Sequence, residues 1–229
     1  MTKGKPAAGG GRWVEVPPER LQRWFAGFAE RHGAVRAEAS AGIVTLVGAD
    51  EAVAECHVPF PPLPAEERDP AEAPDPAEGR DPLDALIAHA CRDRRVGVLL
   101  VRLGGYAAGV FEGVRLVTSK VDTRQVHGRN KAGGWSQQRF ARRREGQARQ
   151  LTDAAAATAA RILLPEVTTL DAVVLGGDRT AVDATLATPA LAPLRERAVE
   201  RFLTVPDPRR DVLEATPAAF RAVRIRLTP

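Results

Sequence analysis

Apolar residues recur along this chain at two different spacings, which separate predicted helices from predicted strands. Near the start, residues 18–31 carry apolar side chains at helical spacing, and two short apolar runs follow at residues 43–47 and 52–58. A buried helix face needs an apolar residue about every 3.6 positions, whereas a strand shows alternating or continuous apolar residues. The pattern therefore predicts a small α+β unit at residues 13–58, preceded by a flexible tail at residues 1–12.

The segment that follows has a different composition. Residues 59–81 are dense in proline, and seven acidic residues outnumber the two arginines, Arg68 and Arg80. Such a composition buries little apolar surface and is typical of extended connections. Residues 59–81 are therefore predicted to form an acidic, proline-rich linker.

The remainder, residues 82–229, predicts a single larger domain. Its expected strands lie at residues 96–103, 106–111, 114–121, 170–177, 202–205 and 222–227, and its expected helices at residues 82–93, 136–164, 179–186, 193–201 and 209–214. Two-residue turns join the first three strands into an antiparallel meander. A meander, a long helix and then alternating strands and helices predict a three-layer α/β domain of the ribonuclease-H-like kind.

Charge is distributed unevenly over this domain. The segment from Arg115 to Arg149 contains ten lysines and arginines and two acidic residues, so its net charge is +8. The whole chain carries +4, so the rest of it carries −4. Segregation of this kind favours a nucleic-acid partner, because each neutralised phosphate releases counterions.

Other features of the composition narrow the class of protein. Cys56 and Cys91 are the only cysteines, and they show no spacing typical of a zinc site or a disulfide framework. No apolar run approaches the length of about 20 residues that a membrane span needs. We expect a cytoplasmic protein with no membrane segment, no metal site and no cofactor.

The strongest candidate for a functional site lies at the start of the long helix, in Gly133-Gly134-Trp135-Ser136-Gln137-Gln138. The glycine pair permits a close approach of the backbone to a ligand, and a glutamine beside it can position water. The basic and aromatic residues around this motif can contact phosphates and bases. The predicted RNA-binding residues are Arg124, Arg129, Lys131, Trp135, Arg139, Arg142, Arg143 and Arg144.

The motif resembles the catalytic loop of the middle domain of eukaryotic and archaeal class-I translation termination factors, in which a Gly-Gly-Gln tip precedes a similar Arg-Phe-Ala-Arg run. Aligned without gaps, the glutamine of those factors falls on Trp135, and glutamine appears here two positions later. The pattern from Gly134 to Gln137 is instead similar to that of the Vms-like release factors, most of all their actinobacterial branch. This resemblance extends over about residues 130–150.

The resemblance implies a monomeric peptidyl-tRNA hydrolase that acts on peptidyl-tRNA bound to stalled or split large ribosomal subunits. Gln137 would position water at the ester, Gly133 and Gly134 would form the loop tip, and Gln138 is the rival catalytic residue. Two alternatives stay open: cleavage within the CCA end of the tRNA, and a ribosome-binding or RNA-binding role without catalysis. A metal-dependent nuclease would need clustered carboxylates, and its candidates are Glu112, Asp122, Asp171 and Asp178.

Overall fold

The computed structural model describes residues 5–6, 10–64, 81–123 and 136–228, although the side chains of Lys5, Thr123 and residues 136–144 lie outside the description. The chain forms two compact units. Unit 1 comprises Met1–Arg92 and Arg221–Pro229, and unit 2 comprises Asp93–Phe220.

Unit 1 is built on a six-stranded sheet in which all neighbouring strands are antiparallel, in the order β1, β2, β11, β5, β4, β3. The strands are β1 (Lys5–Pro6), β2 (Arg12–Val16), β3 (Arg36–Ala39), β4 (Ile43–Val47), β5 (Val53–His57) and β11 (Val223–Thr228). A short 3-10 helix, η1 (Pro18–Arg20), leads into α1 (Leu21–His32), and α2 (Pro82–Cys91) is the last helix of the unit. Leu21 and Phe28 from α1 and Leu86 from α2 are buried in the same core as the apolar side of this sheet.

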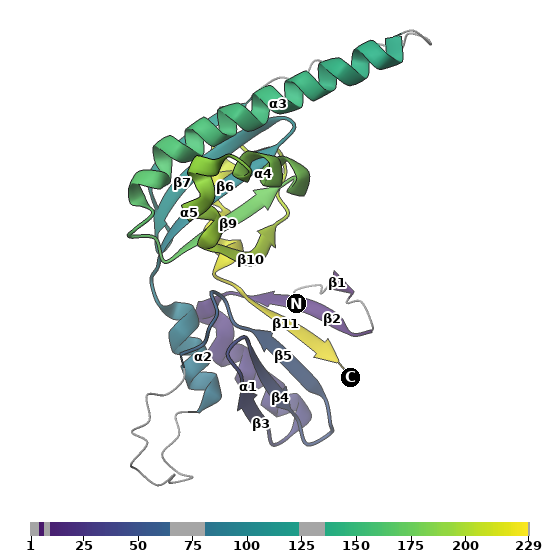
Figure 1. The fold of residues 1–229 in the computed structure, drawn as a ribbon. Coiled ribbons are helices and arrows are strands. Elements are labelled where there is room, and N and C mark those ends of the chain that lie inside the picture. Colours follow the sequence, from purple (N-terminus) through teal and green to yellow (C-terminus); the bar gives the residue numbers. More distant parts are fainter. Residues whose placement is uncertain (1–4, 7–9, 65–80, 124–135, 229) are drawn as a thin grey trace. The chain divides into compact units, whose positions relative to one another are not determined.

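Unit 2 contains a five-stranded sheet in the order β10, β9, β6, β7, β8 (Figure 1). Its strands are β6 (Arg95–Arg102), β7 (Gly105–Glu112), β8 (Arg115–Thr123), β9 (Ala172–Gly177) and β10 (Ala198–Leu203). The first three strands form an antiparallel meander, whereas β9 runs parallel to both β6 and β10. This strand order confirms the predicted ribonuclease-H-like arrangement.

Helices cover both faces of the unit 2 sheet. They are α3 (Ser136–Ile162), η2 (Leu164–Glu166), α4 (Arg179–Leu186), η3 (Pro189–Leu191), α5 (Ala192–Glu196), α6 (Arg210–Glu214) and α7 (Thr216–Phe220). On one face, Leu151 and Ala155 of α3 share a core with Leu99 of β6. On the other, the ring of Phe220 in α7 lies edge-on to that of Phe111 in β7, with centroids 5.8 Å apart. The three predicted layers are therefore present.

The division into units differs from the predicted boundaries. Helix α2 and strand β11 were predicted in the larger domain, but both belong to unit 1. Leu86 of α2 is fully buried in the unit 1 core, and β11 pairs with β2 and β5. The alternating burial of β11, in which Val223 and Ile225 face the core, fits a sheet with one covered face.

The beginning of the predicted linker also packs on unit 1. Leu63 is 8% exposed, and its backbone N–H donates to the carbonyl of Ala41 at 2.7 Å. The ring Nε2 of His89 lies 2.9 Å from the carbonyl oxygen of Pro59. Residues 65–80 of the predicted linker lie outside the described residues.

A smaller difference concerns the region before β10. The helix predicted at residues 193–201 is shorter, because α5 ends at Glu196 and β10 begins at Ala198. Strand β10 lies at an edge of the sheet and pairs with β9 in an irregular register. Its residues lack a clear alternation of burial, so the local pattern did not indicate where the strand begins.

Candidate functional site

The predicted catalytic segment is joined to unit 2 through the end of β8 and the start of α3. Strand β8 ends at Thr123, which pairs with Gly105 at the start of β7. One residue earlier, Asp122 accepts a hydrogen bond of 3.0 Å from the hydroxyl of Tyr106, which is 4% exposed. Because β8 and β9 run in the same direction as β6, all three strands end on the same side of the sheet.

The second half of α3 is packed firmly on unit 2. Leu151, Ala155 and Ala159 are buried, and the helix contacts β7 and α4. Alanines along the buried side let the helix approach the sheet closely, and their burial contributes to stability by removing apolar surface from water. This half of the helix provides a fixed base for the segment that precedes it.

The described residues before that base are exposed. Glu145, Gly146, Gln147, Arg149 and Gln150 are all exposed, whereas Ala148 is partly buried. A Cβ atom at Gly146 would meet no atom within 4 Å apart from its chain neighbours and the backbone of its own helix. Helix α3 has 27 residues, which corresponds to a length of roughly 40 Å at 1.5 Å per residue. In Figure 1 its ribbon lies across the sheet of unit 2 and continues past it.

The predicted site residues fall at the start of this helix or just before it. Gly133 and Gly134 lie outside the described residues, as do Arg124, Arg129, Lys131 and Trp135. The backbone of Gln137 and Gln138 lies in the first turn of α3, since the helix begins at Ser136. Their side chains are outside the description, and so are those of Arg139, Arg142, Arg143 and Arg144.

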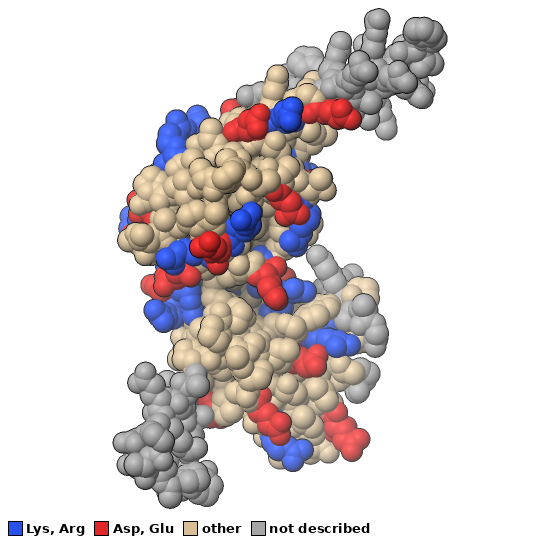
Figure 2. Space-filling model, in the orientation of Figure 1, with Lys and Arg blue, Asp and Glu red and all other residues tan. Residues whose placement is uncertain are grey.

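The charge of the described surface is mixed. Figure 2 shows lysines and arginines interspersed with aspartates and glutamates over the described residues. Of the ten basic residues between Arg115 and Arg149, the description covers the side chains of Arg115, Lys120 and Arg149. The predicted basic surface therefore depends mainly on residues 124–144.

The four carboxylates considered for a metal-dependent nuclease do not come together. Asp122 accepts from Tyr106 at the end of β8, and Asp178 caps α4 by accepting from the backbone N–H of Ala181 at 2.9 Å. Glu112 and Asp171 lie at the opposite edge of the sheet, next to the start of β6. Within the described ranges, no group of three or more histidine, cysteine, aspartate or glutamate side chains has the geometry to hold a metal ion.

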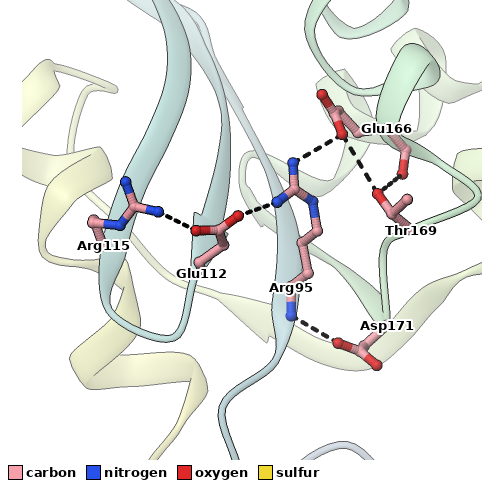
Figure 3. A network of polar contacts seen from close by, with 6 residues as sticks. All are labelled: Arg95, Glu112, Arg115, Glu166, Thr169 and Asp171. Carbon is pink, nitrogen blue, oxygen red and sulfur yellow. Dashed lines mark hydrogen bonds and ion pairs between the residues drawn. The ribbon is translucent and has the colours of Figure 1, made fainter.

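A polar network at that opposite edge joins the end of α3 to the sheet (Figure 3). The guanidinium of Arg95 donates to Glu112 and, at 2.9 Å, to Glu166 of η2, which directly follows α3. The backbone N–H of Arg95 donates to the carboxylate of Asp171 at 2.7 Å. Glu112 also accepts from Arg115. We call Arg95, Glu112, Glu166 and Asp171 the Arg95 network.

Electrostatics favour the charged state of this network. The hydrogen bond to Glu166 raises the pKa of the Arg95 guanidinium, although desolvation by burial acts in the opposite direction. The side chain of Arg95 is 25% exposed and that of Glu166 is 35% exposed, so solvent screens the pair only in part. Sequence reasoning missed the pair because its members are 71 positions apart.

The topology defines unit 2 as an α/β domain with a long helix, α3, whose first turn contains the backbone of Gln137 and Gln138. No match to the chain was found among curated proteins. Residues 94–226 match the family model described as Actinobacteria/chloroflexi VLRF1 release factor. The match covers more than half of the chain, so this protein belongs to that release factor family.

Solved structures of termination factors show a distant likeness. The crystal structure of the archaeal translation termination factor aRF1 is 16% identical, with a TM-score of 0.42, and the match covers 91% of this chain and 66% of that one. Dom34 of S. cerevisiae, a translation termination-like factor, is 9% identical with a TM-score of 0.34, over 95% of this chain and 69% of that one. The chain thus spans about two thirds of the length of these factors.

Membership of this family places the protein among release factors, which act in translation. None of the helices in the described ranges has the length and apolar character to cross a lipid bilayer.

Proposed function

We propose that this protein is a peptidyl-tRNA hydrolase that frees nascent chains from tRNA on stalled or split large ribosomal subunits. The observation that carries the proposal is the match of residues 94–226 to a release factor family. The Gly133–Gln138 motif at the start of α3 supports it, because a glycine pair lets the backbone near Gln137 approach a ligand closely, as entry into a narrow catalytic centre requires.

The proposed reaction is hydrolysis of an ester. Water attacks the carbonyl carbon that joins the peptide to the terminal ribose of the tRNA, and the bond between that carbon and the ribose oxygen breaks. One proton of the water passes to the ribose oxygen and the other is released to solvent, so the products are a peptide with a free carboxylate and a tRNA with a free hydroxyl. A neutral amide is a poor general base, so Gln137 contributes by orienting water and by donating a hydrogen bond to developing negative charge.

The start of α3 supports this chemistry in a second way. The first backbone N–H groups of an α-helix have no partner within the helix, and the helix dipole favours negative charge at that end. Because α3 begins at Ser136, Gln137 belongs to the turn that carries these groups. A developing oxyanion near Gln137 would therefore meet additional donors.

The basic residues give the protein its proposed partners, ribosomal RNA and the tRNA. Four arginines within six positions, from Arg139 to Arg144, repel one another unless anions compensate them. Phosphate groups provide that compensation, and forked guanidinium groups bind them with two parallel hydrogen bonds. We expect the monomeric protein to bind through this segment.

The test is a release assay with three measured products. Purified protein is incubated with large ribosomal subunits that carry peptidyl-tRNA, and free peptide, intact tRNA and shortened tRNA are resolved. Ester hydrolysis predicts free peptide together with intact deacylated tRNA. Shortened tRNA would instead identify cleavage in the CCA end, and binding without any product would identify a non-catalytic factor.

A control for metal dependence accompanies this assay. Release is measured after divalent ions are removed with EDTA, with subunit integrity checked by sedimentation. The proposal predicts that release persists wherever the subunits stay intact. Loss of release from intact subunits would favour a metal-dependent reaction and contradict the proposed chemistry.

A further inference from the structure

The Arg95 network lies far from the predicted catalytic glutamine, yet it holds the other end of the same helix. Helix α3 ends at Ile162, Leu163 is fully buried, and Glu166 follows within η2. The hydrogen bond of 2.9 Å between Arg95 and Glu166 therefore joins η2, the turn that follows α3, to the first residue of β6, the central strand of the sheet (Figure 3).

Several contacts fix the orientation of Glu166 relative to the sheet. Arg95 uses one terminal nitrogen for Glu112 on β7 and the other for Glu166. The hydroxyl of Thr169 donates to the carbonyl of Glu166 at 2.8 Å, which closes the turn that carries the glutamate. Because a guanidinium is planar and rigid, its two bonds fix Glu166 relative to both β6 and β7.

The length of α3 amplifies any change at its base. From Ile162 to Ser136 the helix extends roughly 40 Å, and a tilt of about 5° would move its first turn by roughly 3 Å. A displacement of about 1 Å at a reacting centre can already reduce a rate by about 100-fold. Packing of Leu151 and Ala155 opposes such a tilt, and the hydrogen bond between Arg95 and Glu166 adds a directional restraint that apolar contacts alone do not supply.

We propose that Arg95 and Glu166 are positioning residues that set the direction of α3 and, through it, the place of Gln137 in the reaction. The inference rests on the proposed hydrolase function. According to this inference, the Arg95 network affects the rate of peptide release and leaves the binding of ribosomal subunits unchanged.

The test separates rate from affinity. Glu166→Ala removes the carboxylate, and the rate of peptide release at saturating subunits is expected to fall by about 10-fold or more, with the dissociation constant for subunits unchanged. Glu166→Gln keeps an oxygen that accepts from Arg95, so release is expected to stay close to that of the unaltered protein. Arg95→Lys is expected to resemble Glu166→Ala, because an ammonium lacks the fork that reaches both glutamates.

A matched control accounts for simple destabilisation. Thr216→Val removes a buried hydrogen bond of 2.7 Å between the Thr216 hydroxyl and the carbonyl of Leu213, on the face of the sheet opposite α3. We expect this variant to lose stability without altering the contacts at the end of α3. If Glu166→Ala and Thr216→Val reduced release equally at equal stability, the positioning role would be overturned.

A distance measurement tests the geometry independently of catalysis. Spin labels are attached at Gln147→Cys on α3 and Leu103→Cys, which is exposed in the turn after β6, in a Cys91→Ser background. Cys56 remains unlabelled because burial raises the pKa of its thiol to about 12. Glu166→Ala is expected to broaden or shift the distance distribution, and Thr216→Val is expected to leave it unchanged.

These readouts distinguish failure of the inference from failure of the proposed function. If the unaltered protein releases peptide but Glu166→Ala changes neither release nor distances, the inference fails and the function stands. If the unaltered protein releases nothing, the function fails, and an unchanged distance distribution in Glu166→Ala would overturn the inference separately.

Discussion

The two halves of α3 differ in what they contact. From Leu151 to Ile162 the helix buries Leu151 and several alanines in the core of unit 2, whereas the described residues from Glu145 to Gln150 are mostly exposed. The motif that resembles a release factor loop precedes these exposed residues in the sequence. The packed half of the helix stabilises the domain. The residues before it are not constrained by the core, so their sequence can be adapted to binding and catalysis. Substitutions in the two halves should have separable effects.

The largest effect on stability is expected from Leu151→Ala. Leu151 is 3% exposed at the start of the packed half, and its truncation is expected to lower the free energy of unfolding by about 2–5 kcal/mol. Unfolding in urea, followed by circular dichroism, measures the change. Gln150→Ala is the matched control, because Gln150 is the exposed neighbour and should change stability by less than about 0.5 kcal/mol. Equal effects at the two positions would contradict the division of α3.

The largest effect on activity is expected from Gln137→Ala. If Gln137 positions water and stabilises developing charge, its removal should lower the release rate by about 100-fold to 1,000-fold. Stability and subunit binding should be unchanged, because the first turn of α3 precedes the packed half. Gln138→Ala provides the neighbouring control and should retain most activity. The reverse result would assign the catalytic role to Gln138, and full activity in both variants would remove glutamine from the mechanism.

A smaller effect is expected on the salt dependence of binding. Replacing Arg142 and Arg143 by alanine should weaken subunit binding and reduce the slope of log affinity against log salt by about 0.7–0.9 for each phosphate that these arginines neutralise. Affinity measured at several salt concentrations gives the slope. Arg161→Ala is the control, since Arg161 is an exposed arginine at the other end of α3. If Arg161→Ala changed the slope per arginine as much as the Arg142 and Arg143 substitutions do, the total charge and not its position would determine subunit binding.

Comparison of the sequence with the structure shows which features were predictable. The meander from β6 to β8, the long helix α3 and the unit of β9 and α4 followed from local patterns, because apolar periodicity and glycine turns are encoded within short windows. The family resemblance of residues 130–150 likewise needed no tertiary information. These parts of the fold and the family were correctly predicted.

Features that depend on distant partners were not predictable in this way. The last strand, β11, pairs with β2 and β5. Nothing in its own residues favours these strands over those of the unit 2 sheet, which are nearer in the sequence. The link between Arg95 and Glu166 joins positions far apart in sequence, so no local motif reveals it. The roles of Gln137 and its neighbours stay predictions, because their side chains lie outside the described residues.

The smallest predicted effect, at Gly146, tests whether the two halves of α3 unfold together. Gly146 lies within the exposed segment, and a Cβ there would meet no atom within 4 Å beyond its chain neighbours and its own helix backbone. Gly146→Ala should therefore favour the helix by about 1 kcal/mol without a steric cost. If the exposed segment opens independently, the gain should appear as slower amide exchange at residues 145–150, with little change in the free energy of global unfolding.

The matched substitution in the packed half is Ala157→Gly, at an exposed position of the same helix. Its cost of about 1 kcal/mol should appear in global unfolding, because that half of α3 shares the core of unit 2 and unfolds with it. The two substitutions exchange glycine and alanine in opposite directions, one on each side of the boundary near Leu151. If Gly146→Ala raised global stability by the full amount that Ala157→Gly lowers it, α3 would behave as one cooperative element. The exposed segment would then be as firmly folded as the packed half.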